Sequence, residues 1–530
     1  MPDSRMYGYL VIGAGPAGLQ AGYCLQEQGC DYLILEGGQA PGTSFERFPR
    51  HRKLISINKV HTGYDDPEIN LRWDWNSLLS DEQPSLRFPD FSRRYFPDAD
   101  DMPRYLKGFA EQHQLNVRSG CTVTNVKRDG HFIVTLGDGE QLHARVLIVA
   151  TGVHLGWLPA IEGIEHAEHY ADMDVDPESM TNKKVLILGK GNSAFETADA
   201  LIEHAAMIHV ASPNPLRMAW STHYVGHVRA VNNNLLDTYQ LKSQNAVLDA
   251  QLQRIERDGE RYKAWFAYQH AEGELEMIEY DHVIACTGFR FDDSLFDDSC
   301  RPQLCTQGRL PVQSADWQCA NVPDLYFAGT LMQYLDYKKY MSGFIHGFRY
   351  NVRTLCRLLH ERYEGIALPR QTLALQTEAL CERLLARINR SSALWQQPGY
   401  LQDVAVLDRK ERTLTCFEEL TMLQVAERFA GQEYLTLTLE FGQRKFDNPF
   451  NVERIGRENV KRAEDSNFLH PIVRHYRDGK LLAEHHVIED LAAEWREPEH
   501  VEPLLAFLDQ RLHASVAPHY MSLFQTIPTF

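Results

Sequence analysis

The chain has 530 residues, of which 44% are hydrophobic and 24% charged, so its length indicates a large globular protein of about three or four domains. Its formal net charge of -18 argues against a nucleic-acid partner, because Lys and Arg must neutralise phosphates to release counterions. The apolar runs are too short to cross a bilayer, and no basic segment followed by an apolar one opens the chain, so we expect a cytoplasmic protein without membrane partners.

The first predicted elements form a dinucleotide-binding fingerprint. Residues 7–12 read as a buried strand, Gly13-Ala14-Gly15-Pro16-Ala17-Gly18 as a tight turn, and residues 19–28 as a helix. Gly13 permits the turn, Gly15 lets the backbone approach a pyrophosphate, and Gly18 allows close helix packing. The helix N-terminus adds amide donors and a partial positive charge, so Gly13, Gly15, Ala17 and Gly18 are candidate cofactor-binding residues.

The next strand, residues 32–35, ends at Glu36. A carboxylate here accepts hydrogen bonds from both hydroxyls of an adenosine ribose and rejects a 2′-phosphate, which suits FAD or NAD. The following stretch, residues 37–101, is polar and aromatic with little periodicity, and such stretches often cover a bound cofactor. Its basic run, residues 47–59, is compatible with a solvated loop and with a contact for phosphate or an anionic substrate.

Residues 101–114 predict a helix, residues 121–128 and 131–136 a hairpin, and residues 144–149 a strand. This last strand ends in Ala150-Thr151-Gly152, a sequence typical of the chain leaving an FAD domain, so Thr151 and Gly152 are further cofactor-binding candidates. A later strand, residues 324–330, is expected to return to the same domain. Its Gly329 would let the backbone approach the ribityl group and phosphates of FAD.

A second fingerprint repeats the pattern. The strand 184–188 leads into Gly189-Lys190-Gly191-Asn192-Ser193-Ala194 and a helix over residues 194–203, so the candidates for the second nucleotide are Gly189, Gly191, Asn192 and Ser193. The strand 207–211 is followed by Ser212-Pro213-Asn214, without an acid corresponding to Glu36, and Arg217 is close in sequence. This combination favours NADPH over NADH, because a guanidinium suits a ribose 2′-phosphate.

The order of these elements predicts an α/β protein with two Rossmann-like domains. An FAD-binding domain, residues 1–154 and 291–355, is interrupted by an NADPH-binding domain, residues 155–290, which a strand over residues 281–289 closes. A C-terminal α+β extension follows, residues 356–530, with a predicted helix at 371–388 and a strand at 434–441. No motif in this extension indicates a chemistry.

The chain also resembles the flavoproteins of the flavin-containing monooxygenase class, and single-component flavin-dependent halogenases are similar in overall plan. The segments that carry this resemblance are residues 49–59, 235–243, 335–339, 343–350 and 466–471. It implies that NADPH reduces FAD, which then forms a C4a-(hydro)peroxyflavin with O2. Two departures from the class are visible. The fuller monooxygenase fingerprint, an aromatic residue, then Gly, then His before the second glycine motif, survives only as Gly163, His166 and His169-Tyr170, and Thr330 stands where many flavoprotein reductases have Asp.

Two residues are candidates for the catalytic groups. Asn58 matches the asparagine that related monooxygenases place beside the flavin; alternatively it stabilises a turn before Lys59. Lys242 would steer a transferred oxygen or relay an electrophilic halogen from a dry pocket; alternatively it is a solvated helix lysine. The pair Trp73 and Trp75 resembles the tryptophan pair of two-component halogenases, with ordinary packing as the alternative.

The sequence therefore predicts an FAD- and NADPH-dependent enzyme that oxygenates, or with halide halogenates, a small aromatic or amino-acid-like molecule. Its expected partners are this substrate, O2 and halide as an option; the oligomeric state is left open, with a homodimer as one option. One alternative is a thiol-disulfide reductase using Cys300 and Cys305, which are spaced as CxxxxC among ten cysteines that show no metal-like cluster. A third option is a flavin-containing scaffold that binds partners through the C-terminal extension.

Overall fold

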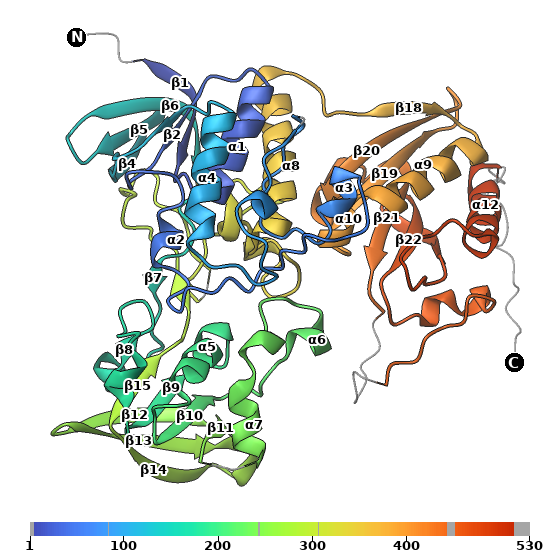
Figure 1. The fold of residues 1–530 in the computed structure, drawn as a ribbon. Helices are drawn as coiled ribbons and strands as arrows, with labels where there is room; N and C mark the ends of the chain where they lie inside the picture. The colour runs from blue at the N-terminus through green and yellow to red at the C-terminus, as the bar shows by residue number, and fades with distance from the viewer. Residues whose placement is uncertain (1–4, 83, 242–243, 306, 443–450, 514–530) are drawn as a thin grey trace, which may run out of the picture. The chain divides into compact units, whose positions relative to one another are not determined.

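The computed structural model describes residues 5–82, 84–241, 244–305, 307–442 and 451–513. The chain forms two compact units (Figure 1): unit 1 comprises Met1–Leu368 together with Trp395–Gln397, and unit 2 comprises Pro369–Leu394 and Pro398–Phe530. The expected domain boundary at residues 355/356 falls inside helix α8 (Ile345–Glu364), which belongs to unit 1. Within the described ranges, no helix combines the length and the apolar character needed to span a bilayer.

The first sheet of unit 1 has seven strands in the order β3-β2-β1-β6-β5-β4, with β17 also paired to β6. The strands β1, β2, β3, β6 and β17 run parallel, whereas β4 and β5 continue the sheet antiparallel. The bounds are β1 (Met6–Ile12), β2 (Tyr32–Leu35), β3 (Val117–Arg118), β4 (Val123–Asp129), β5 (His131–Leu136), β6 (Gln141–Val149) and β17 (Leu325–Phe327). The C-terminal halves of β1 and β6 are fully buried, as expected for strands covered on both faces.

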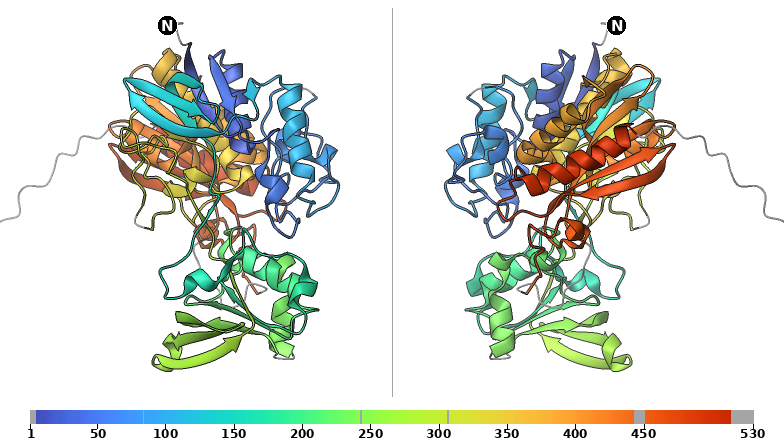
Figure 2. Two further views of the ribbon diagram at one scale, coloured as in Figure 1. Left: turned by 90° about the vertical axis from the view of Figure 1, so that its left-hand side faces the viewer. Right: turned by 90° about the vertical axis from the view of Figure 1, so that its right-hand side faces the viewer.

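Three longer helices pack with this sheet to form what we call the first lobe. They are α1 (Pro16–Glu27), α4 (Asp101–Gln112) and α8. In two views α1 and α8 lie side by side (Figures 1 and 2), so a helix near the start of the chain and one that follows residue 344 share one core. Short helices α2 (Ser44–Arg47) and α3 (Pro67–Asn70) lie in the long segment between β2 and α4.

A second, wholly parallel sheet forms the second lobe of unit 1, in the order β11-β10-β9-β15-β8. Its strands are β8 (Glu168–His169), β9 (Lys184–Leu188), β10 (Met207–Ser212), β11 (Ala246–Asp249) and β15 (His282–Ala285). Helices α5 (Asn192–Leu201), α6 (Ala219–Thr222) and α7 (Asn234–Leu241) belong to this lobe, as does an antiparallel sheet of β12 (Gln251–Asp258), β13 (Arg261–Tyr268) and β14 (Glu274–Tyr280).

A short two-stranded ribbon joins the two lobes. The chain leaves the first lobe through β7 (Leu155–Gly156) and returns through β16 (Phe289–Arg290), and these two strands pair antiparallel. The second lobe is thus inserted between β6 and β17, two neighbouring strands of the first sheet. Such an insertion places the ends of both parallel sheets near the same ribbon.

Unit 2 is a six-stranded antiparallel sheet in the order β18-β20-β19-β21-β22-β23, with α9 and α12 packed side by side on one face (Figure 2). The strands are β18 (Gln371–Ala374), β19 (Leu401–Asp408), β20 (Thr413–Thr421), β21 (Glu433–Glu440), β22 (His470–Arg477) and β23 (Lys480–His486). The helices of unit 2 are α9 (Thr377–Arg390), α11 (Met422–Arg428) and α12 (Pro498–His513), whereas α10 (Ser392–Gln396) begins in unit 2 and ends in unit 1.

The expected fold class is confirmed: two Rossmann-like parallel sheets are followed by a mixed C-terminal portion. The predicted helix over residues 371–388 is wrong in its first part, because Gln371–Ala374 pairs with β20 and the helix begins only at Thr377. A complete backbone ladder with a strand some forty residues later outweighs the local helix propensity of this segment.

Candidate active site

The first glycine turn is built as a cradle at the N-terminus of α1. Gly13 has a φ of +103°, and a Cβ there would lie 2.8 Å from the carbonyl oxygen of Ala150. A Cβ at Gly18 would lie 1.8 Å from the oxygen of Gly13, so the helix packs directly against the turn. A Cβ at Gly15 would meet nothing within 4 Å. Open space in front of a helix N-terminus is where a pyrophosphate fits.

Glu36 lies at the end of β2, beside this cradle, and is 9% exposed. One carboxylate oxygen accepts a hydrogen bond from the Ala14 amide at 2.8 Å and the other from the Gly38 amide at 2.8 Å. Each carboxylate oxygen has a second lone pair, so the fixed carboxylate can also accept from a ribose hydroxyl. The turn and Glu36 therefore fit the pyrophosphate and adenosine ribose of FAD.

The second glycine turn repeats the first. Gly189 has a φ of +112°, and its Cβ would lie 2.4 Å from the carbonyl oxygen of Cys286, which follows β15 as Ala150 follows β6. A Cβ at Gly191 would meet nothing within 4 Å, so the N-terminus of α5 is also open. The two predicted fingerprints are therefore the same device used twice, once in each lobe.

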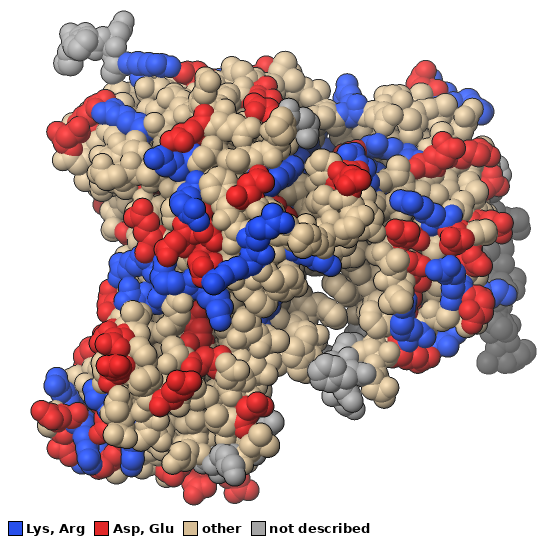
Figure 3. Space-filling model, in the orientation of Figure 1, with Lys and Arg blue, Asp and Glu red and all other residues tan. Residues whose placement is uncertain are grey.

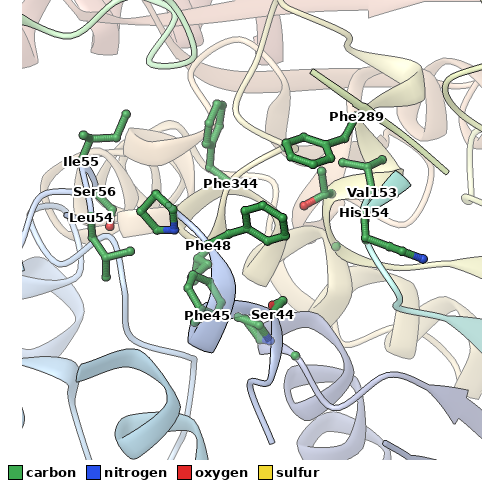
Figure 4. A pocket seen from close by; sticks show the side chains of 18 of the residues that line it. Ser44, Phe45, Phe48, Leu54, Ile55, Ser56, Val153, His154, Phe289 and Phe344 are labelled. Atoms are coloured by element: carbon green, nitrogen blue, oxygen red, sulfur yellow. The ribbon is translucent and has the colours of Figure 1, made fainter. Parts of the chain in front are cut away.

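A cavity of about 800 Å³ lies between the two turns. The rings of Phe45, Phe48, Phe289 and Phe344 face this space (Figure 4), and Trp75 and Phe348 also line it. Seven of the predicted cofactor-binding residues line the cavity: Gly15, Ala17, Thr151, Gly152, Asn192, Ser193 and Gly329. The side-chain oxygen of Thr151 is buried without a hydrogen-bond partner, as expected where a ligand supplies one.

The other predicted cofactor-binding residues lie outside this lining. Gly13, Gly18, Glu36, Gly189 and Gly191 shape the two turns behind it. Arg217 is exposed on the segment after β10. Lys242 lies outside the described residues.

Asn58 is buried, and its Nδ2 donates to the carbonyl oxygens of Ser92 at 2.7 Å and Arg94 at 3.1 Å. It is not among the cavity-lining residues, and its Oδ1 has no hydrogen-bond partner. The amide nitrogen of Asn58 thus binds the backbone of a neighbouring loop, and a catalytic role for Asn58 stays a prediction. Of the tryptophan pair, Trp75 lines the cavity, whereas Trp73 stacks on Tyr64 with ring centroids 5.5 Å apart.

Asn192 uses its side chain to hold a loop of its own lobe. Its Nδ2 donates to the carbonyl oxygens of Gly226 at 3.3 Å and His227 at 2.9 Å, and its Oδ1 accepts from the Arg229 amide at 2.9 Å and from the side chain of Asn232. Its backbone amide at the start of α5 is the group left for a nucleotide. The side chain instead fixes Arg229, which also lines the cavity.

Lys190 is turned away from the phosphate position of the second turn. Its Nζ donates to the carbonyl oxygens of Ser212 at 3.2 Å and Asn214 at 3.1 Å and forms an ion pair with Asp249. These bonds brace the segment after β10, where an adenosine ribose would lie. Ser212 ends β10, at the position that corresponds to Glu36 in the first lobe.

The most perturbed acid of the cavity is Glu196, on α5. Burial raises the pKa of Glu196 to about 7, and the opposing effects of a hydrogen bond from Tyr170 and the charge of Lys53 are smaller. The Tyr170 hydroxyl also accepts from the Arg50 amide at 2.9 Å. Sequence analysis did not single out Glu196, although its place one turn into the fingerprint helix was a usable signal.

The basic segment of residues 47–53 fastens the two lobes together. Arg47 donates to the carbonyl oxygen of Ala171 at 2.8 Å, Arg50 to that of Met173 at 2.7 Å, and His51 contacts Thr197 at 3.1 Å. Figure 3 shows Lys and Arg side chains gathered near α2, between the two lobes. Arg47 and Arg50 are therefore not free solvated side chains, because they bind the second lobe. Lys53 of the same run lines the cavity, and a contact of this run with an anionic ligand stays a prediction.

The thiols lie away from the cavity. Among the described residues that line it there is no cysteine, and Cys300 and Cys305 are free thiols packed in the core beside the first sheet. The Cys300 thiol donates to the Val126 carbonyl oxygen at 3.3 Å, and burial raises its pKa to about 11. A thiol with such a pKa is a poor nucleophile at neutral pH.

Two lobes with matching glycine turns around one aromatic cavity define a flavin- and nicotinamide-dependent oxidoreductase. The chain belongs to the pyridine nucleotide-disulphide oxidoreductase family, whose model matches residues 10–329, and membership implies FAD and NAD(P)H as cofactors. The expected resemblance is thereby confirmed.

Among its relatives, the chain is similar to the mouse FAD-dependent oxidoreductase domain-containing protein 2, at 37% identity over 97% of this chain and 85% of that protein. It is 29% identical to the probable indole-3-pyruvate monooxygenase YUCCA1 of Arabidopsis thaliana, over 40% of this chain and 49% of that protein. A flavin-containing monooxygenase from Stenotrophomonas maltophilia shares the fold, with a TM-score of 0.52, 22% identity, and coverage of 66% of this chain and 97% of that chain.

Proposed function

We propose that the protein is an NADPH-dependent flavoprotein monooxygenase acting on a small aromatic substrate. One atom of O2 enters the substrate and the other leaves as water, while NADPH supplies two electrons. Bound FAD supplies the chemistry that accepts hydride and passes these electrons to O2. The observation that carries the proposal is the cavity itself, because both nucleotide turns open on a space walled by aromatic rings and free of described cysteines.

The residues around the cavity have distinct tasks in this reaction. The rings of Phe45, Phe48, Phe289 and Phe344 exclude water from the cavity (Figure 4). Excluding water limits the loss of activated oxygen as hydrogen peroxide. With a pKa of about 7, Glu196 is partly protonated at neutral pH and can exchange a proton with groups in the cavity. The name of the YUCCA1 relative supports oxygen insertion, and the missing acid after β10 supports NADPH over NADH.

Halogenation is a sharper variant of the same proposal. An arene, a halide ion, O2, NADPH and two protons would then yield the halogenated arene, NADP+ and two water molecules. The aromatic lining of the cavity suits this variant as well, because an electrophilic halogen must also be kept from water.

The proposal is tested by product analysis with the purified flavoprotein. NADPH and 18O2 are supplied with phenols, indoles and aromatic amino acids, with and without bromide. We expect substrate-dependent NADPH oxidation and a product that carries one 18O atom, or bromine when bromide is present. NADPH consumption that yields only hydrogen peroxide with every substrate would contradict the proposal. The variant Cys300→Ser/Cys305→Ser is the control, because a dithiol enzyme would lose disulfide reduction and a monooxygenase would lose nothing.

A further inference from the structure

Arg229 brings an uncompensated positive charge to the cavity. Its backbone is fixed by Asn192, and its guanidinium NH1 donates to the carbonyl oxygen of Ile55 at 2.9 Å. The pKa of Arg229 lies below its usual value because burial removes water, and only Tyr95 offsets this effect. In the described part of the chain no Asp or Glu forms an ion pair with this side chain. A partly buried guanidinium without a counter-charge favours an anionic ligand.

An aromatic stack continues from this guanidinium. The guanidinium of Arg229 lies over the Trp75 ring, 5.2 Å from the ring centroid. Trp75 stacks on His346 with ring centroids 4.3 Å apart, and His346 stacks on Phe344 with ring centroids 5.8 Å apart. All four residues line the cavity. A wall of this kind binds a flat ring through its faces and edges.

His346 adds a polar group to this wall. It is 2% exposed, and its Nε2 is buried without a hydrogen-bond partner. The pKa of His346 lies well below its usual value because of burial and the charges of Arg349 and Arg229, so the ring is neutral. Its Nε2 can therefore exchange one hydrogen bond with a ligand without adding a charge.

We infer that Arg229 and His346 anchor the carboxylate of an aromatic acid, whose ring packs against the Trp75 and Phe344 wall. This inference rests on the proposed function, because it takes the cavity as the substrate site. The guanidinium reaches from the second lobe to Ile55 and Trp75 of the first lobe, whereas the α5 amides face the nucleotide position. That direction favours a substrate carboxylate over a phosphate of the nicotinamide nucleotide.

The test measures binding without turnover. The oxidised flavoprotein is titrated with indole-3-acetate and 3-phenylpropionate and with their neutral amides, by calorimetry or by the change in flavin absorbance. We expect each acid to bind about tenfold or more tightly than its amide, as one charge-assisted hydrogen-bond pair provides. Arg229→Met should abolish this preference and leave the affinity for NADP+ and for the amides unchanged.

Two further variants complete the design. Arg229→Lys keeps the positive charge without the planar guanidinium and should retain part of the preference for the acid over its amide. This variant replaces Arg229→Met in the test if Arg229→Met purifies without flavin. Arg93→Met removes an exposed arginine outside the cavity lining and should behave as the unmodified protein.

Three results would overturn the inference: equal binding of acid and amide by the unmodified protein, no binding of either acid at millimolar concentration, or an Arg229→Met variant that loses NADP+ and keeps the acid. The last result would assign the guanidinium to a nucleotide phosphate. Because no oxygenation is measured, these results are independent of the monooxygenase proposal, which neutral substrates can still support.

Discussion

Two ionisable side chains that line the cavity are partly shielded from water but form no ion pair with another described residue. Glu196 and Arg229 lie in the same lining but are not paired with each other, and their pKa values move in the directions that burial dictates: upward for the carboxyl group and downward for the guanidinium. Charged groups that are buried in proteins are normally paired with an opposite charge. Leaving both groups unpaired at one cavity is typical of a site that completes its contacts with ligands.

The ionisation of Glu196 should be visible in the pH dependence of NADPH oxidation. With a pKa of about 7, the carboxylate forms as the pH rises through neutrality and stabilises the positive charge that the nicotinamide gains on losing hydride. We expect the rate per flavin to rise severalfold between pH 6 and pH 8, about one pH unit either side of that pKa, and Glu196→Gln to flatten this profile. Glu46→Gln, which removes an exposed acid at the same cavity, is the control and should keep the inflection. A persisting inflection in Glu196→Gln would assign the titration to another group.

Asp336 makes a separate prediction for stability. It is 2% exposed, its Oδ2 accepts from the Ser342 amide at 3.2 Å, its Oδ1 has no partner, and burial raises its pKa to about 7. Unfolded chains release this proton near pH 4, so the stability of the fold decreases as the pH rises from about 4 through 7, by up to roughly 4 kcal/mol.

Urea midpoints at pH 5 and pH 8 test this expectation for Asp336. The unmodified protein should lose more stability between these pH values than Asp336→Asn, which cannot ionise. Asp298→Asn, at a fully exposed position, is the control and should follow the unmodified protein. Parallel losses in all three proteins would show that Asp336 is not the titrating group.

At the scale of elements, one strand-turn-helix device is used twice with the same steric logic. In each lobe the first glycine of the turn lies against the carbonyl that follows the neighbouring parallel strand, Ala150 for Gly13 and Cys286 for Gly189. The positive φ and the short Cβ distance both exclude a side chain. A substitution in one turn should therefore impair only the nucleotide site of its own lobe, because each turn belongs to its own sheet.

Gly13→Ala and Gly189→Ala form a matched pair. Gly13→Ala should purify with little flavin, whereas Gly189→Ala should keep flavin and show a KM for NADPH raised about tenfold or more, since strain and a backbone clash together cost about 1–3 kcal/mol. Gly139→Ala is the control, because Gly139 has a φ of +89° but open space at its Cβ position in a distant turn. Flavin absorbance and NADPH titration are the measurements. Loss of flavin in Gly189→Ala would contradict the independence of the two sites.

Elements whose signals are local were predictable, and arrangements that depend on distant chain segments were not. The two glycine turns and Glu36 follow from strand, turn and helix signals within a short stretch. The stack of Arg229, Trp75 and His346 joins three remote segments, and no local pattern indicates it. Asn192 was predicted as a cofactor-binding residue from its position in the fingerprint. The partners of its side-chain amide depend on the fold of residues 226–232, which the sequence does not indicate.

At the scale of the whole molecule, the described cavity lining belongs entirely to unit 1, but three residues of unit 1 come from within the unit 2 sequence. In this segment, Gln396 donates to the carbonyl oxygens of Leu71 at 3.0 Å and Arg72 at 2.6 Å. The fully buried Arg349 holds the same loop through the carbonyl oxygens of Leu71, Asp74 and Ser77. Trp75 belongs to this loop, so part of the cavity wall is held by residues inserted from the C-terminal sequence.

Gln397, next in the chain, is also fully buried and binds a second wall segment. Its Oε1 accepts from the Met341 amide at 3.0 Å, and its Nε2 donates to Ser342 at 3.3 Å and Asn351 at 3.2 Å. Gly343, Phe344 and His346 follow directly along the chain and line the cavity. The two glutamines therefore hold, from one short segment, both sides of the aromatic wall formed by Trp75 and His346.

This arrangement predicts a specific defect for Gln396→Ala/Gln397→Ala. Each lost hydrogen bond costs about 1 kcal/mol, so the wall should loosen and the KM for an aromatic substrate should rise about tenfold. The rate of NADPH oxidation without substrate and the flavin content should stay the same, because both glycine turns are untouched. Gln112→Ala is the control, since Gln112 donates to the Pro84 carbonyl oxygen at 3.2 Å, outside the cavity lining. An unchanged KM, or a loss of flavin that matches the loss of substrate affinity, would show that the segment supports the fold as a whole and not this wall.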